Sequence, residues 1–460
     1  MSYQMIWNLP APQLDAFVVA SDQNTLFQCS SWADIKVNWK SQRIGVSRDG
    51  TLVAAALVLI RPMPLGKTLL YIPRGPVMDY HNPELVEFML AGLKTLAKEK
   101  HAIDIRFDPA VLSRVYPYKE RKEPHDRQNE DVIALLQSLD ARHKGYTTAI
   151  IESTQPRFNA AMDVTADFEK KLEHKTVKCI RAAVHKGVEV FEGPQYLDDF
   201  ATAMHYTEVR KKVALRNKEY FANMLRVYGD HCILMVAKLN FPKQISRMQE
   251  EIDALQKKLD AQPDQQEAEQ LKVKLQKNRS LLKQFKSDGE DHKAEIKALN
   301  KENQQLQARQ KLQLSAADLQ QLQQQMENDR KEVERLKEEY AREGREEVIT
   351  CGILAVYNDK LMELFYMGNH PDYMRLYSSY LLYSKCLQRC VELGIHHCSF
   401  GGVEGTLDDG LTLFKSNWLM NVEEYIGEFN IVTDPFLYSM FDRVYPLFLK
   451  HAMKESGKSR

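Results

Sequence analysis

The chain has 460 residues, of which 63 are basic and 63 acidic, and its formal net charge is zero. This length predicts two or three domains with sizeable cores. Zero net charge excludes an overall basic field, so a polyanion has to be bound by a local basic patch. The sequence shows neither a secretory leader nor an apolar run of about 18 residues, and its seven cysteines are scattered. These features predict a protein of a reducing compartment, the cytoplasm.

The N-terminal part alternates short β-rich runs with one clear helix. Strands are predicted at 53–59, 68–72 and 103–107, and a helix is predicted at 83–98. The order strand, strand, helix, strand is typical of an acyltransferase-like α+β fold. We therefore predict a first domain over residues 1–165.

The same order returns in the C-terminal half. A strand is predicted at 231–239, and two more follow residue 347, joined by a turn at 357–360. A helix then ends at Gly394 and leads into the strand HHCSF. We interpret this as a second, related domain formed by 166–241 and 347–460. The predicted fold class is α+β, with two such domains in tandem.

Between the two parts of the second domain, residues 242–346 have the composition of a coiled coil. Aromatic residues almost vanish there, while Gln, Glu, Lys and Leu dominate. Ile245, Ile252 and Leu259 repeat at intervals of seven, which is typical of a coiled-coil seam. The segment is therefore predicted to be an inserted helical arm.

The arm is expected to fold back on itself. The Asp-Gly pair in SDGED, 287–291, predicts a chain reversal near its middle. Pro263 is expected to break the first half, and Ser315 can cap a restarting helix opposite it. An antiparallel hairpin returns the chain to where it left, so the two strands that flank the insertion can still pair. Taken alone, the pattern leaves open whether the arm is a spacer, a self-association device or a docking element.

Short motifs outside the arm resemble those of the Fem family of peptidoglycan bridge-forming aminoacyltransferases, of the FemA, FemB and FemX types. They run in order through nearly the whole chain outside the insertion. The matching stretches are SWADIKVNW (31–39), YIPRGPVMD (71–79), IRFDPAV (105–111), TQPRFN (154–159), KTVKCIRAAVHKGVEV (175–190), ALRNKEYFANM (214–224), FGGVEG (400–405), GLTLFKSNW (410–418) and EEYIGEF (423–429).

This resemblance implies a fold of two GNAT-like domains with an antiparallel arm similar to that of seryl-tRNA synthetases. It implies that an amino acid moves from aminoacyl-tRNA to the side-chain amine of the third stem-peptide residue of a peptidoglycan precursor, building the interpeptide bridge. It implies no separate cofactor, because the tRNA ester is already activated. The acceptor is either a UDP-linked or a lipid-linked muropeptide, and the second would bring the protein to a membrane surface.

The resemblance also assigns four substrate-binding side chains. Lys36 and Arg216 match the two cations that hold the precursor's phosphates, a task suited to a guanidinium fork. Tyr220, four residues after Arg216 and on the same helical face, matches a substrate-contacting tyrosine, as does Tyr366. Without the resemblance, Lys36 reads as a solvated lysine between two tryptophans and Tyr366 as a half-buried strand residue.

Two further residues match the family's catalytic positions. Lys415, in LFKSNW, matches the lysine near the developing oxyanion, where a buried cation stabilises the transition state. Asp108, in RFDP, matches the carboxylate that orients or deprotonates the attacking amine, and its alternative is an Asp-Pro turn after a strand. Glu404 and Glu428 are weaker candidates, because both carboxylates can instead satisfy buried backbone donors.

Two other patterns carry less weight. The basic run at 175–186 fits contacts to nucleic-acid phosphates, and its alternative is an ordinary solvated helix face. Cys386, Cys390 and the HHC sequence at 396–398 have the residue types of a zinc site. They lie on an apolar helix and an apolar strand, where buried thiols are common. The sequence therefore predicts no metal site.

The sequence is compatible with three functions for the whole chain. The first is the tRNA-dependent aminoacyltransferase. The alternative is a GNAT-like scaffold without catalysis that docks a sister transferase, or a second copy of itself, through the arm. An acetyl-CoA-dependent acyltransferase is disfavoured, since the sequence lacks the glycine-rich pyrophosphate loop of such enzymes.

Overall fold

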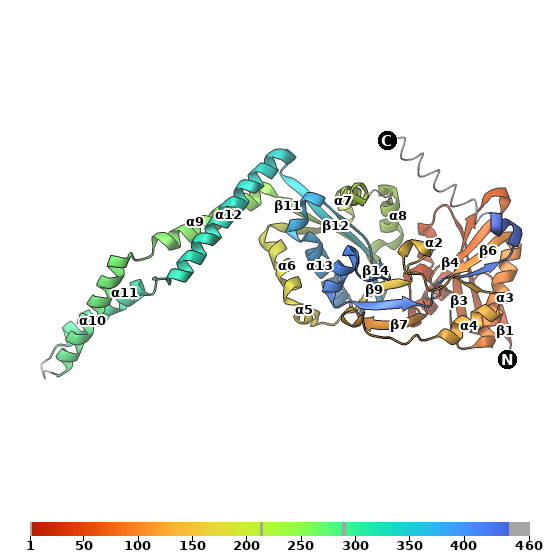
Figure 1. Ribbon diagram of the computed structural model, residues 1–460, viewed down its shortest axis with the longest axis horizontal. Coiled ribbons are helices and arrows are strands. Elements are labelled where there is room, and N and C mark those ends of the chain that lie inside the picture. Colours follow the sequence, from red (N-terminus) through yellow and green to blue (C-terminus); the bar gives the residue numbers. More distant parts are fainter. Residues whose placement is uncertain (1, 212–214, 288–290, 441–460) are drawn as a thin grey trace. The chain divides into compact units, whose positions relative to one another are not determined.

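The computed structural model describes residues 2–211, 215–287 and 291–440. The chain divides into two compact units, one from 1–238 with 349–460 and the other from Leu239–Val348 (Figure 1). The first unit is built around two eight-stranded sheets, and the second consists mainly of helices. In the part of the chain that is described, no helix has both the length and the apolar character needed to cross a membrane.

The first sheet contains mainly N-terminal strands. Their order is β1-β2-β3-β4-β6-β16-β8, with β5 paired to β3. The strands are β1 Tyr3–Ile6, β2 Lys40–Arg48, β3 Thr51–Pro62, β4 Thr68–Ile72, β5 Val77–Met78, β6 Ala102–Phe107, β8 Arg142–His143 and β16 Phe429–Val432. The expected strands at 53–59, 68–72 and 103–107 are thereby confirmed.

One helix covers much of this sheet. This helix, α3, spans Pro83–Glu99. It begins at Pro83 because the side chain of Asn82 accepts the Leu85 N–H and because proline suits the first helical position, where no N–H is needed. β3 is buried on both faces and therefore contributes to two cores. Ala56 faces the core under α3, and Leu57 on the opposite face packs with apolar residues of the second sheet.

The second sheet has the order β10-β11-β12-β13-β14-β9-β15-β7. Its strands are β7 Leu112–Pro117, β9 Phe158–Asp163, β10 Val188–Glu192, β11 Cys232–Asn240, β12 Glu347–Tyr357, β13 Leu361–Asn369, β14 His397–Val403 and β15 Asn421–Tyr425. The remaining helices of this unit are α1 Ala11–Ala20, α2 Ser31–Ile35, α4 Glu130–Ser138, α5 Phe168–Lys171, α6 His174–His185, α7 Leu197–Lys211, α8 Lys218–Tyr228, α13 Ser378–Leu393 and α14 Gly410–Lys415. As predicted, β11 and β12 are neighbours although the insertion separates them in sequence.

The two sheets exchange strands, which the predicted boundary at residue 165 does not anticipate. β7 and β9 precede that boundary but belong to the second sheet, and β16 lies near the end of the described chain but belongs to the first. β16 pairs antiparallel with β6 and β8, while β15 pairs with both β7 and β9. Segments that a division at 165 would separate therefore meet at the junction of the two sheets.

The second unit confirms the predicted antiparallel hairpin. Helix α9 (Phe241–Asp260) packs against α12 (Ala316–Glu343), and α10 (Gln265–Ser287) packs against α11 (Lys293–Gln310). The break between α9 and α10 contains Pro263, and the side chain of Ser315 caps α12 by accepting the Asp318 N–H. The predicted reversal at 287–291 falls largely on residues 288–290, outside the described residues.

Polar pairs interrupt the apolar seam of the hairpin. Met248, Ile252 and Val333 are buried between α9 and α12. Farther along, the amide of Asn278 donates to the Asn303 side chain at 3.1 Å. Such a buried amide pair between helices favours one register over others, at a cost in stability.

Candidate active site

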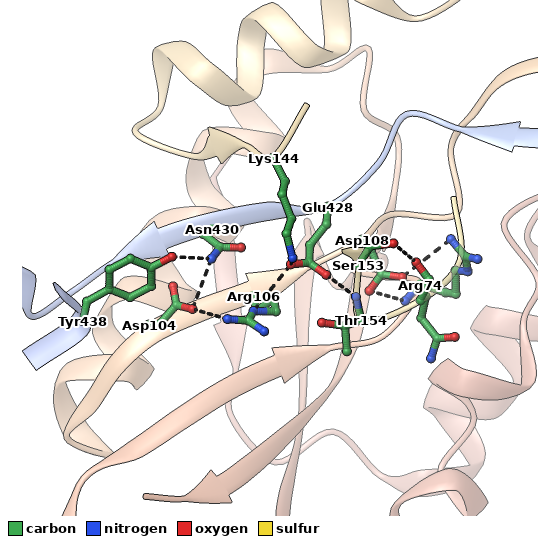
Figure 2. Close-up of polar contacts among 11 residues, drawn as sticks. Arg74, Asp104, Arg106, Asp108, Lys144, Ser153, Thr154, Glu428, Asn430 and Tyr438 are labelled. Atoms are coloured by element: carbon green, nitrogen blue, oxygen red, sulfur yellow. Dashed lines mark hydrogen bonds and ion pairs between the residues drawn. The ribbon is translucent and has the colours of Figure 1, made fainter. Parts of the chain in front are cut away.

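The carboxyl ends of β4 and β6 bring Arg74 and Asp108 together. These strands are parallel neighbours, so residues that follow them emerge at the same edge of the sheet. The Arg74 backbone N–H donates to Asp108 Oδ1 at 3.4 Å, and Arg74 Nη1 lies 3.6 Å from Asp108 Oδ2. Figure 2 shows the two side chains facing each other. Both residues are buried.

The environment of Asp108 favours its neutral form. Burial raises the pKa of Asp108 to about 7, although the positive charge of Arg74 opposes this, and the negative charge of Glu428 adds to the rise. A carboxyl group that titrates near neutral pH can accept a proton from an ammonium group and release it again. Asp108 therefore has the electrostatics of a weak general base.

We expect the activity of the protein to follow this titration. Below pH 7 Asp108 is mostly protonated and cannot accept a proton, so kcat/KM should rise as pH increases through about 7. Asp108→Asn should lose this inflection and about 10²-fold in rate at pH 8, the lower end of the range for a general base. Initial rates from pH 5.5 to 9 would test this. An unchanged inflection in Asp108→Asn would assign the titration to another group.

The carboxylates of Glu428 and Glu404 both accept hydrogen bonds from backbone N–H groups. Glu428 Oε2 accepts the Thr154 N–H at 2.6 Å, and Lys144 Nζ lies 3.0 Å from Oε1 (Figure 2). Burial alone would raise the pKa of Glu428, but the Arg106 charge and these bonds lower it, so it stays ionised. Glu404 Oε2 accepts the Ile150 N–H at 2.9 Å. Both carboxylates anchor the 150–154 segment, in keeping with their alternative reading.

Lys415, at the end of α14, is held against a bulge in β14. Its Nζ donates to the carbonyl oxygens of Gly401 at 3.0 Å and Gly402 at 2.9 Å. The register between β14 and β9 shifts at this point, and Gly401 has a φ of +78° that favours glycine. Burial lowers the pKa of Lys415 to about 8, against the charge of nearby Glu363. The lysine is thus a buried cation in a fixed position.

A small cavity of about 80 Å³ connects these features. Arg74, which contacts Asp108, lines one part of it, and Gly402, whose carbonyl accepts from Lys415, lines another. Its other polar lining residues include Asn159, Glu363, His397, Ser399 and Glu423. Asp108 and Lys415 do not line the cavity themselves, but each contacts a residue that does.

The four predicted substrate-binding residues come together at a second place. The hydroxyl groups of Tyr220 and Tyr366 lie 3.3 Å apart, and the Arg216 guanidinium lies 5.0 Å from the centre of the Tyr220 ring. Burial and the nearby charge of Arg216 together lower the pKa of Lys36 to about 8. Arg216 and Tyr220 line a cavity of about 630 Å³.

This pair of cations has the character of an anion site. Within the described ranges, neither Lys36 nor Arg216 has a carboxylate at ion-pair distance. Two like charges held together raise each other's energy, and a bound dianion would relieve that repulsion. The arrangement suits a diphosphate.

Sequence reasoning missed several residues of the first cavity. Arg74 and Glu423 both lie in quoted motifs, YIPRGPVMD and EEYIGEF, but were not singled out. Glu363 was visible as one acidic residue in the apolar strand LMELFYMGN. His397 belongs to the HHC sequence considered for zinc, while Cys386 and Cys390 are buried within α13.

Comparison with known proteins identifies the family. The model of the FemAB family matches residues 9–308 and 279–445. The chain belongs to the FemAB family. This confirms the resemblance seen in the sequence motifs.

Named relatives of this FemAB protein align over nearly its whole length. The lipid II:glycine glycyltransferase of Staphylococcus aureus strain MRSA252 is 25% identical over 96% of each chain. That of Staphylococcus epidermidis strain ATCC 35984 is 26% identical over 98% of each chain. A crystal structure of FemX matches with a TM-score of 0.69 and 22% identity, over 96% of this chain and 99% of the other. The predicted fold class, α+β with two GNAT-like domains in tandem, is thereby confirmed.

Proposed function

We propose that this FemAB protein is an aminoacyltransferase of peptidoglycan synthesis that adds an amino acid to a lipid-linked muropeptide. The relatives named above support the reaction class and the acceptor, and their names make glycine our choice of amino acid. The observation that carries the proposal is a polar cavity lined by Arg74, which contacts Asp108, and by Gly402, whose carbonyl belongs to the Lys415 latch. We define the latch as Lys415 with its bonds to the carbonyls of Gly401 and Gly402.

The proposed donor is an aminoacyl-tRNA, and the proposed nucleophile is the side-chain amine of the third stem-peptide residue. Asp108 takes a proton from the attacking ammonium group, and the free amine attacks the ester carbonyl. Lys415 stabilises the negative charge that develops on the carbonyl oxygen. The C–N bond forms as the ester C–O bond breaks, and the terminal ribose hydroxyl of the tRNA leaves with a proton. No acyl-enzyme is required.

The tRNA body needs a basic surface outside the cavity. Lys175, Lys178 and Arg181 are exposed on α6 and fit contacts with phosphates. The N-terminal part of α6 lies near the site, because Thr176 Oγ1 donates to the Asn417 carbonyl two residues after Lys415. We propose that the phosphates near the acceptor end lie along this face, and that the helical hairpin contacts the tRNA elsewhere.

The first experiment is a transfer assay with purified protein. A pool of labelled aminoacyl-tRNAs would be combined with either UDP-linked or lipid-linked muropeptide, and the label followed by mass spectrometry. We expect glycine to reach the lipid-linked acceptor. Transfer to the UDP-linked acceptor alone would correct the choice of acceptor. If folded protein transfers no amino acid from any tRNA, the proposal that it is an enzyme is wrong, and the non-catalytic docking scaffold becomes the favoured function.

Lys36→Met should weaken binding of the muropeptide without altering the chemical step. Removing one of two adjacent cations from a phosphate site costs roughly 1.5 to 3 kcal/mol, so we expect KM for the acceptor to rise about 10- to 100-fold. The rise should shrink with added salt, as wild-type binding weakens. Lys40→Met, at the exposed first residue of β2 and four residues after Lys36, is the matched control. A loss confined to kcat would contradict the assignment.

A further inference from the structure

A row of polar side chains crosses the middle of the second sheet. Glu363 on β13 stands opposite Ser399 on β14, and Asn159 on β9 stands opposite Glu423 on β15. β13, β14, β9 and β15 are consecutive neighbours in this sheet. All four residues line the cavity of about 80 Å³. A polar row of this kind is costly in a sheet that is otherwise mostly apolar, which points to a function.

Internal contacts hold one end of the row in place. The Asn159 amide donates to Glu423 Oε2 at 2.8 Å and to Ser399 Oγ at 3.2 Å. His397 Nε2 lies 3.3 Å from Glu423 Oε1, and its Nδ1 lies 3.5 Å from Asp163. Glu423 is therefore oriented by two neighbours before any ligand arrives.

The other end of the row is not neutralised by a close cation. In the described portion of the chain, Glu363 has no lysine or arginine within ion-pair distance. Arg74 lines the cavity as well, but its guanidinium contacts Asp108 and stacks on Tyr425, 3.8 Å from the ring centre. The Glu363 carboxylate thus has Ser399 as a hydrogen-bond partner but no lysine or arginine at ion-pair distance among the described residues.

A second, independent observation lies on the Arg74 side. Asp108 is 2% exposed, and its Oδ2 accepts no hydrogen bond from the residues that the structure describes. The guanidinium of Arg74 balances the charge at 3.6 Å, but Oδ2 still has room for a hydrogen bond from a ligand donor. Arg74 thus links the cavity, which Glu363 and Glu423 line, to a second acceptor, Asp108, that does not line the cavity itself.

We propose that this cavity holds the aminoacyl group of the donor, and that Glu363 and Glu423 receive its α-ammonium group. The inference rests on the proposed function and adds the location and chemistry of the donor subsite. The attacking amine would then approach from the Asp108 side. Glu363 and Glu423 are binding and specificity residues in this scheme.

The size of the cavity restricts the amino acid. At roughly 10 to 15 Å³ for each water-sized group, 80 Å³ holds five to eight such groups. A glycyl ester has five heavy atoms. Gly402 and Pro156 both line the cavity and are tightly packed against each other, since a Cβ added at Gly402 would lie 2.3 Å from Pro156 Cγ. Glycyl and alanyl donors fit, whereas a leucyl side chain adds four more atoms.

The test compares glycyl-tRNA with glycolyl-tRNA, in which a hydroxyl replaces the ammonium group. Wild-type kcat/KM should favour glycyl-tRNA about 10- to 100-fold, as expected for hydrogen bonds to a charged group. Glu363→Gln should lower kcat/KM for glycyl-tRNA by that factor and leave glycolyl-tRNA unchanged. Glu423→Gln should act in the same direction. Asp359→Asn, an exposed acid in the turn before β13, should change neither donor.

A readout without catalysis completes the test. A stable 3′-glycylamido adenosine should compete with glycyl-tRNA about 10- to 100-fold better than its glycolyl counterpart, and Glu363→Gln should abolish the difference. Equal use of both donors by the wild type, or an equal loss on both donors in Glu363→Gln, would overturn the inference while leaving the proposed function intact. Wild-type protein that is folded yet transfers from no donor would remove the proposed function itself.

Discussion

Lys415→Met should lower the rate of transfer by about 10²- to 10³-fold, the cost of losing one preorganised charge at an oxyanion. Lys415 is buried, and its ammonium group is fixed by the carbonyls of Gly401 and Gly402 beside the cavity. The neutral methionine keeps most of the side-chain volume but cannot stabilise developing negative charge. Single-turnover transfer with saturating donor and acceptor measures the chemical step directly.

The fold should survive this change. Because burial lowers the pKa of Lys415, the folded protein holds the ammonium form at a cost, which methionine removes and which offsets the two lost hydrogen bonds. The midpoint temperature of thermal unfolding should therefore change little. If Lys415→Met transfers at a rate within a few-fold of wild type, the lysine has only a structural role, which is to hold the carbonyls of Gly401 and Gly402 at the β14 bulge.

The pH dependence of the transfer rate tests whether the positive charge of Lys415, rather than the shape of its side chain, is what the reaction needs. The ammonium form of Lys415 is lost as pH rises through about 8, so activity should decline on the alkaline side. Lys415→Arg keeps its charge at every pH of interest. The alkaline decline should vanish in that variant, whatever its absolute rate. A decline that persists in Lys415→Arg would belong to another group.

Glu424→Gln should destabilise the two-sheet unit by roughly 3 to 5 kcal/mol, the usual cost of removing one partner from a buried ion pair. Glu424 is fully buried and forms ion pairs with both Arg157 and Arg114. Arg157 Nε also donates to the Thr147 carbonyl at 2.6 Å. Without Glu424, the buried Arg157 guanidinium would keep its charge with no carboxylate at ion-pair distance among the residues that the structure describes.

Chemical denaturation followed by tryptophan fluorescence measures this loss. Trp418 is fully buried and should report the transition. Arg157→Met combined with Glu424→Leu should recover part of the loss, because only the partly exposed Arg114 then lacks its carboxylate partner. Arg114→Met should cost less, since that side chain is partly exposed. A loss below about 1 kcal/mol in Glu424→Gln, the range of exposed pairs, would mean that water screens the cluster.

Local features of the fold were predictable because they depend on neighbours in sequence. The helix capped by Asn82 follows from an Asn-Pro start and an apolar period. The helix capped by Ser315 follows from the same rules. Pairing of β11 with β12 across the insertion followed from the geometry of a hairpin. The evidence for the two helices lay within a few residues of their caps. The evidence for the pairing was that an antiparallel hairpin returns the chain to its starting point.

The exchanged strands could not be predicted in this way. β7 and β9 have ordinary strand sequences, and hydrophobic alternation says which face is buried but not which strand lies alongside. Glu363 shows the same limit at the site. One acid in an apolar strand was visible, but its meaning required Ser399, Asn159 and Glu423 from three other strands. Residues recognised by resemblance, such as Lys36 and Arg216, were the exception.

The exchange of β16 has a consequence for biosynthesis. β16 lies between β6 and β8 in the first sheet, yet a ribosome makes Phe429–Val432 only after the whole hairpin insertion. The nascent N-terminal half therefore waits, with the β6 edge unpaired, for more than three hundred further residues to be synthesised, between Phe107 and Phe429. Open strand edges invite pairing with other chains. Fragments that stop before β16 should accordingly be recovered with chaperones or as aggregates, whereas the complete chain closes its own edge.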